Sequence, residues 1–176
     1  MVDYANNLIA LVRGQIVVAD ISFGSGASQS VQAVPAIGLA YITSYLRKKG
    51  YEVVFIDGTG EGLDSQYPLQ DYPGFSSQGL QLGEIISRIP KQVKVIGFSG
   101  MFSGEWPVMR DLISQTRESF PEALLVAGGE HITALTEYSL RDCPALDIAV
   151  RGEGEHTFYK LLEAYLGTGS FSDVPA

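Results

Sequence analysis

The chain has 176 residues, a length that suits one domain with a sizeable core. Its formal charge of -8, from 12 Lys and Arg against 20 Asp and Glu, argues against nucleic-acid binding because an acidic surface repels phosphate backbones. The sequence has no polybasic run and no apolar run near the ~20 residues of a membrane span, and its single cysteine excludes an internal disulfide framework. These features predict a cytoplasmic protein with neither a nucleic-acid nor a membrane partner.

The first elements along the chain are an apolar strand and an amphipathic helix. Residues 16–21 (IVVADI) form a continuous apolar run, which is typical of a strand buried on both faces of a parallel sheet. The run 8–12 competes for this role, but Gly14 separates the two, and we assign the first strand to 16–21. Residues 1–14 are then an N-terminal extension. The helix is predicted over 35–49, with Pro35 in its first turn and Gly50 closing it.

The rest of the chain continues the alternation of strands and helices. Strands are predicted over 51–56, 93–98, 123–127 and 147–150, and helices over 107–116, 133–140 and 157–166. Such an alternation implies a parallel sheet with right-handed crossovers. We therefore predict a single α/β domain over 1–176 with a doubly wound, five-stranded parallel sheet, Rossmann-like or flavodoxin-like, in the order 2-1-3-4-5.

One connection is longer than this architecture needs. Residues 58–79 contain five glycines, two prolines and three aromatic residues, and they follow the second predicted strand. So long an irregular connection is uncommon in a compact domain and is usually functional or mobile. Two interpretations stay open, namely a loop that serves a ligand at this edge and a surface loop without a role.

Glycine-rich and polar segments follow four of the five predicted strands. The carboxyl ends of parallel strands meet at one edge of a sheet, so these segments are expected side by side. Small residues let backbone amides approach a bulky ligand, and each following helix offers free amides at its N-terminus. The predicted site residues are Ser22 and Phe23, Ser99, Gly100 and Met101, Gly128, Gly129, Glu130 and His131, and Gly152, Glu153 and Gly154.

Each of these features also has a purely structural interpretation. A Gly-Gly pair after a strand serves as a tight turn into a helix, and Glu153 and Glu155 suit the positive end of the last helix. His131 and His156, the only two histidines, are both compatible with surface positions. The functional hypothesis therefore depends on the four segments occurring together and in order.

Several stretches together resemble a known family, the N-terminal cobalamin-binding domain of cobalamin-dependent radical S-adenosylmethionine (radical SAM) proteins. The matching stretches are 35–42 (PAIGLAYI), 46–53 (LRKKGYEV), 96–99 (IGFS), 126–133 (VAGGEHIT) and 150–155 (VRGEGE). The resemblance extends from about the first strand to the last helix. The VRGEGE and GG-x-H stretches are fairly specific at this separation, although neither is specific alone.

The resemblance implies where cobalamin would lie. The corrin ring would cover the carboxyl ends of the strands, with the nucleotide tail against the sheet and the predicted site residues near the cofactor. Glu130 departs from the family, which usually has proline there. Ser22 stands where the methionine-synthase-like group carries a cobalt-binding histidine after strand one, so a base-off form without a protein histidine ligand is expected. The lower axial position of the cobalt would then be taken by Met101, by water or by no group, and these alternatives stay open.

The chain does not contain what a radical SAM catalyst requires. Three cysteines spaced C-x-x-x-C-x-x-C hold the [4Fe–4S] cluster of that family, and this chain has one cysteine. The resemblance therefore implies a cofactor domain whose catalytic partner, in cis or in trans, supplies the cluster and S-adenosylmethionine for a reaction of the methyltransferase type. Residues 171–176 resemble the start of the connector, so 168–176 are expected to begin a linker.

Two further functions remain open from the sequence. A flavodoxin-like FMN-binding domain would use the serine-rich segment 22–30 as its phosphate loop. A scaffold domain that has kept the fold without a cofactor is the other alternative, because fold alone does not determine function. A receiver domain is excluded because the third strand ends in Ser99 rather than aspartate, and no P-loop or dinucleotide fingerprint is present.

Overall fold

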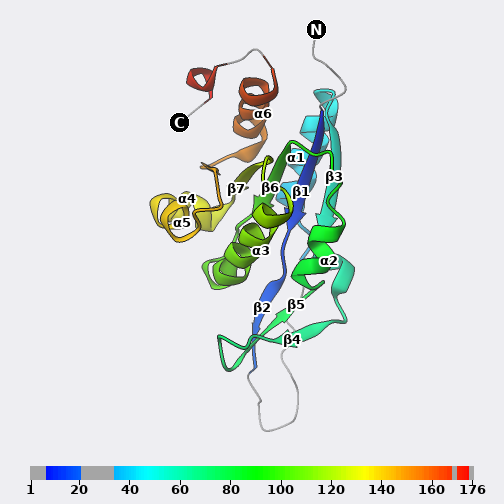
Figure 1. Cartoon of the computed structure of the whole chain (residues 1–176), viewed down its shortest axis with the longest axis vertical. Coiled ribbons are helices and arrows are strands. Elements are labelled where there is room, and N and C mark those ends of the chain that lie inside the picture. The colour runs from blue at the N-terminus through cyan, green and yellow to red at the C-terminus, as the bar shows by residue number, and fades with distance from the viewer. Residues whose placement is uncertain (1–6, 21–33, 168–169, 175–176) are drawn as a thin grey trace.

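The computed structural model describes residues 7–20, 34–167 and 170–174, and its centre is a five-stranded parallel sheet (Figure 1). The strand order is β3-β1-β6-β7-β8. The strands are β1 (Leu8–Arg13), β3 (Glu52–Asp57), β6 (Val95–Ser99), β7 (Leu124–Gly128) and β8 (Ile148–Val150). Counted along the chain, these five strands have the order 2-1-3-4-5, so the predicted doubly wound α/β fold is confirmed.

Helices cover both faces of the sheet. One apolar cluster joins the sheet to α1 (Ile37–Lys48) and α6 (Gly154–Leu166), and a second joins it to α2 (Leu82–Ser87) and α3 (Trp106–Ser119). The helix expected over 133–140 is two short helices, α4 (Glu130–Ala134) and α5 (Thr136–Asp142). None of the helices in the described ranges is long and apolar enough to cross a membrane.

The prediction that residues 16–21 form the first strand of the parallel sheet is wrong. That strand is β1, which pairs with β3 on one side and β6 on the other. Ile9 and Leu11 belong to one apolar cluster and Ala10 and Val12 to the other, so β1 is buried on both faces. Residues 1–14 are consequently not an extension outside the fold, because they include an inner strand.

The second apolar run instead forms β2 (Ile16–Ala19) in a separate sheet. This small antiparallel sheet has the order β2-β5-β4, with β4 (Gln66–Pro68) and β5 (Phe75–Gln78). It projects beyond the end of β1 in Figure 1. Buried and half-buried residues alternate along β2, because only one of its faces is covered.

The prediction of an irregular connection over 58–79 is also wrong. The segment contains a short 3-10 helix, η2 (Gly60–Gly62), followed by β4 and β5. Ser76 on β5 donates a hydrogen bond from its hydroxyl to Asp20 Oδ1 at 2.8 Å, and Asp20 donates its backbone N–H to Gly74 O at 2.8 Å. These bonds join the segment to the end of β2. Two further 3-10 helices are η3 (Ser103–Glu105) and η4 (Phe171–Asp173).

Candidate functional site

A cavity of about 290 Å³ opens at the carboxyl edge of the parallel sheet. Its floor is apolar and is formed by Leu11, Val126, Val150 and Phe158. Its rim consists of the segments that follow β6, β7 and β8, together with the first turn of α1. The cavity therefore lies where ligands of doubly wound folds bind.

Gly97 lets the cavity reach the middle of the sheet. This residue lies within β6, between Leu11 on β1 and Val126 on β7. A Cβ atom at position 97 would lie 2.8 Å from Leu11 Cδ2 and 3.3 Å from Phe158 Cζ, so a side chain here would displace the cavity floor. A lone glycine within an apolar strand marks a close approach by a ligand or another chain segment.

The turn after β7 requires glycine at position 129. Gly129 has φ +119° and ψ −178°, a backbone region that is essentially restricted to glycine. A Cβ atom there would lie 2.6 Å from Gly100 O. The Gly100 N–H donates to Gly128 O at 2.7 Å, so the loops after β6 and β7 are joined directly through their backbones.

The rim is completed by the start of α6. The Gly152 N–H donates to Thr133 Oγ1 at 3.0 Å, which attaches the segment after β8 to α4. Glu153 is the residue before α6, and the 13-residue helix begins at Gly154. The unpaired amides of the first turn of a helix favour a polar or anionic ligand group.

Most of the predicted site residues lie together at this edge. The structure places eight of them in the cavity lining: Ser99, Met101, Gly128, Gly129, Glu130, Gly152, Glu153 and Gly154. Gly100 is adjacent but does not line the cavity, and Ser22 and Phe23 lie outside the described residues. Leu11, Gly38, Gly97 and Phe158 also line the cavity and were not predicted, although an isolated glycine in a strand pattern is a signal for Gly97.

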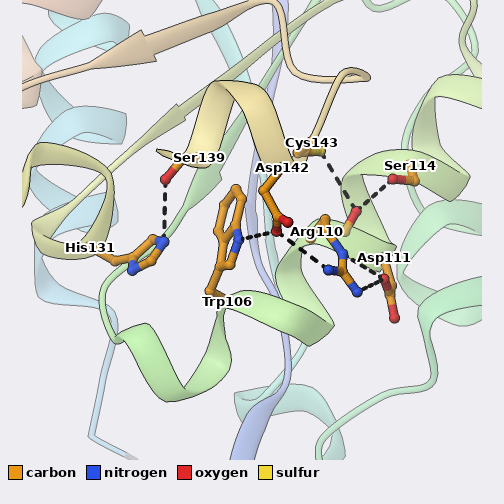
Figure 2. Close-up of polar contacts among 8 residues, drawn as sticks. All are labelled: Trp106, Arg110, Asp111, Ser114, His131, Ser139, Asp142 and Cys143. Carbon is orange, nitrogen blue, oxygen red and sulfur yellow. Dashed lines mark hydrogen bonds and ion pairs between the residues drawn. The ribbon is translucent and has the colours of Figure 1, made fainter. Parts of the chain in front are cut away.

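His131 is predicted to lie beside the cofactor, but in the structure its side chain does not line the cavity. Its side chain is buried, with the residue only 3% exposed, and the ring stacks on Trp106 with the ring centroids 4.8 Å apart. Figure 2 shows the ring beside Trp106, with Ser139 on α5 as a polar partner. Burial lowers the pKa of His131, so the imidazole is neutral at pH 7.

A second cavity of about 220 Å³ adjoins the first. The two cavities share four lining residues: Gly38, Leu39, Ser99 and Met101. Arg13 and Glu105 give the second cavity its charged groups. Burial raises the pKa of Glu105 to about 7, and the nearby Arg13 charge partly opposes this shift.

Glu105→Gln is expected to remove a pH dependence of stability. The native pKa of Glu105 exceeds its ordinary value of 4.5, so the native state binds more protons than the unfolded state between pH 4.5 and about 7. The free energy of unfolding should therefore fall, relative to that of Glu105→Gln, as the pH rises through this window. Urea unfolding of both proteins from pH 4.5 to 7.5 measures the difference. His131 acts in the opposite direction but is common to both proteins, and parallel curves would contradict the prediction.

The donor set of the site suits a large ligand held by shape and backbone. Among residues 7–20, 34–167 and 170–174, no three His, Cys, Asp or Glu side chains gather in a way that could hold a metal ion. Four glycines of the rim instead expose backbone close to the opening, and the floor beneath is apolar.

Comparisons with known proteins agree with this geometry. The model of the family described as the B12 binding domain matches residues 26–162. A cytidylyl-2-hydroxyethylphosphonate methyltransferase of Streptomyces wedmorensis is 33% identical over 140 residues, which cover 78% of this chain and 26% of the relative. An uncharacterized methyltransferase of Pyrococcus horikoshii is 30% identical over 131 residues, covering 74% of this chain and 24% of the relative.

A third relative belongs to another enzyme class. The anaerobic magnesium-protoporphyrin IX monomethyl ester cyclase of Cereibacter sphaeroides is 27% identical over 152 residues, covering 86% of this chain and 22% of the relative. The chain thus spans about a quarter of the length of these curated relatives. The family match extends over most of the chain and includes β6, β7 and β8, whose ends form the cavity rim. The chain belongs to the B12-binding domain family.

Proposed function

We propose that the chain holds cobalamin at the carboxyl edge of the sheet, with the corrin over the rim and the nucleotide tail in the cavity. The cavity itself carries the proposal, because it opens at this edge and reaches Gly97 in the middle of β6. The aromatic base of the tail is flat and largely apolar, which suits a floor of Leu11, Val126 and Phe158. Ser22 and Phe23, together with Gly100, are retained as candidate contacts beside the eight lining residues.

The chain's own residues would bind the corrin through backbone and shape. Gly128, Gly129, Gly152 and Gly154 present little side-chain bulk at the opening, so amides can approach the polar groups at the corrin edge. Glu130 adds a carboxylate to the same rim. When bound, cobalamin would supply a cobalt centre that can carry a methyl group.

We further propose that no protein histidine coordinates the cobalt. The two histidines are His131, which is buried against Trp106, and His156, which is exposed on α6 and does not line the cavity. Since β1 ends at Arg13, Ser22 does not directly follow the sheet strand as expected. The whole stretch 14–36 between β1 and α1 contains no histidine, so it offers no imidazole to the cobalt wherever Ser22 lies.

The size of the relatives supports the proposal of a domain that works with a larger enzyme. Two of them are methyltransferases by name, and each is about four times as long as the region it shares with this chain. We propose that this chain is the cofactor carrier of a radical SAM enzyme of the methyltransferase type. The partner domain, in cis or in trans, would bind the [4Fe–4S] cluster and S-adenosylmethionine.

A binding experiment tests the cofactor assignment. The purified chain is mixed with hydroxocobalamin, free ligand is removed by gel filtration, and the visible spectrum of the protein fraction is recorded. A parallel sample receives FMN in place of hydroxocobalamin. We expect near-stoichiometric retention of cobalamin with a base-off spectrum and no retained flavin. Retention of flavin alone would falsify the proposal in favour of a flavodoxin-like function, and retention of neither would favour a scaffold.

A further inference from the structure

His131 joins the two loops that form the rim of the proposed cobalamin site. Its backbone N–H lies between two acceptors of the loop after β6, at 3.2 Å from Gly100 O and 3.1 Å from Met101 O. His131 itself follows the Gly128-Gly129 turn after β7 by two residues. The backbone of His131 therefore already connects the rim segment after β7 to the rim segment after β6.

The imidazole ring makes a second connection between the same loops. His131 Nδ1 lies 2.9 Å from Ser103 Oγ in the loop after β6, and His131 Nε2 lies 3.3 Å from Ser139 Oγ on α5. The Ser139 hydroxyl donates its proton to Leu135 O at 2.9 Å, so it must accept from Nε2–H. Nδ1 is then the unprotonated nitrogen that accepts from the Ser103 hydroxyl. A neutral histidine supplies this pairing of one donor and one acceptor.

A rigid neighbour fixes the plane of the ring. Trp106 stacks on the imidazole with an interplanar angle of 27°, and its Nε1–H donates to Asp142 Oδ2 at 2.9 Å. Arg110 also contacts Asp142, with Nη1 and Oδ2 3.4 Å apart. Figure 2 shows these groups as one cluster that connects α3 with α5. The ring is consequently held on both edges and on one face.

We propose that His131 is a positioning residue for cobalamin binding, an inference that rests on the proposed function. His131 would act by holding Met101 against the Gly129 turn. Met101 lines both cavities and is half exposed, so its position determines the shape of the opening. Its Sδ lies 3.2 Å from where a Cβ of residue 129 would stand, which places the thioether directly beside the turn. Loss of the His131 ring contacts would free the loop from Met101 to Ser103.

The test compares three variants in cobalamin affinity. His131→Phe keeps a flat ring on Trp106 and removes both hydrogen bonds, and Ser103→Ala removes only the bond to Nδ1. The third variant is the double substitution. We expect cobalamin to bind about tenfold more weakly to His131→Phe and roughly threefold more weakly to Ser103→Ala, as for the loss of neutral hydrogen bonds. The double substitution should bind like His131→Phe, because the hydroxyl then has no partner to lose.

Two further measurements separate positioning from general stability. The visible spectrum of bound cobalamin should shift in His131→Phe, because the groups beside the corrin have moved. Ser114→Ala is the matched control, since the Ser114 hydroxyl on α3 is also a hydrogen-bond donor, to Arg110 O at 2.9 Å, and Ser114 lines neither cavity. Its affinity and spectrum should equal those of the wild type, and urea unfolding of each variant shows whether the fold is intact.

The outcomes distinguish this inference from the function on which it rests. A wild-type chain that retains no cobalamin overturns both. Suppose instead that the wild type retains cobalamin. If Ser103→Ala then binds it as tightly as the wild type does, or if the effects of the two substitutions add in the double variant, the positioning role of His131 is overturned and the proposed function stands. Should His131→Phe not fold, Ser103→Ala decides the question by itself, because Ser103 is exposed and its truncation leaves the core unchanged.

Discussion

Gly38→Leu should weaken cobalamin binding about a hundredfold while leaving the fold intact. Gly38 is in the first turn of α1 and lines both cavities, yet a Cβ atom at this position meets nothing within 4 Å. A leucine side chain would therefore occupy space that the proposed ligand needs, and overfilling a packed site costs about 1–3 kcal/mol. Replacing glycine by leucine in a helix also favours folding by several tenths of a kcal/mol or more.

The control for this variant is Gly83→Leu. Gly83 lies in α2, also has nothing within 4 Å of a Cβ position, and lines neither cavity. Equilibrium dialysis with hydroxocobalamin and urea unfolding are measured for both proteins. Gly83→Leu should bind like the wild type. Unchanged binding by Gly38→Leu would show that the ligand does not enter the space beside α1.

We expect Gly129→Ala to lower the free energy of unfolding by about 3 kcal/mol, since the position combines two costs. Its φ of +119° lies in a region that is essentially glycine-only, and residues forced there cost about 1–3 kcal/mol. In addition, the new Cβ would lie 2.6 Å from Gly100 O, so the turn must move away from the loop after β6. Urea unfolding measures the loss, and cobalamin affinity should fall with it because the rim is displaced.

Gly152→Ala separates the two costs. Gly152 also has a positive φ, +65°, but no atom lies within 4 Å of its Cβ position. The backbone cost alone should then appear, about 1–2 kcal/mol for an alanine in the left-handed region. Equal losses in the two variants would mean that contact with Gly100 contributes nothing at position 129.

The parallel sheet was predictable because its strands carry simple signals. Four of the five strands are short apolar runs bounded by charged residues or glycine, and alternating helices imply parallel pairing. The first strand was assigned wrongly because residues 8–12 and 16–21 are both apolar. Only their tertiary partners distinguish them, since β1 lies between two strands and β2 pairs with β5 alone.

The small sheet could not be found from periodicity. Its central strand β5 has the sequence FSSQ, in which Ser76 and Ser77 are buried and Phe75 is exposed. Hydrophobic alternation therefore predicts no strand here. Pairing with β2 and β4 forms this strand, and the hydrogen bond from Ser76 to Asp20 satisfies one of the buried hydroxyls.

The rim segments that follow β6, β7 and β8 could be predicted from the sequence, whereas the floor of the site and the part of the rim on α1 could not. Glycines after consecutive parallel strands must meet at one edge, so Gly128 and Gly152 were predicted to lie close together. Gly38 and Gly97 are single glycines within regular elements, and their significance depends on which neighbours surround them. For His131, the motif indicated importance at the site, whereas the direction of its ring depends on where Trp106 lies.

The stacking of Trp106 on His131 also has a spectroscopic consequence. Trp106 is the only tryptophan of the chain, so selective indole excitation reports a single environment. That indole is buried, stacks on an imidazole and begins the helix that follows the Met101 loop. The emission of the unlabelled protein therefore originates next to the rim of the cavity, and each rearrangement of the cluster can be followed there without an attached dye.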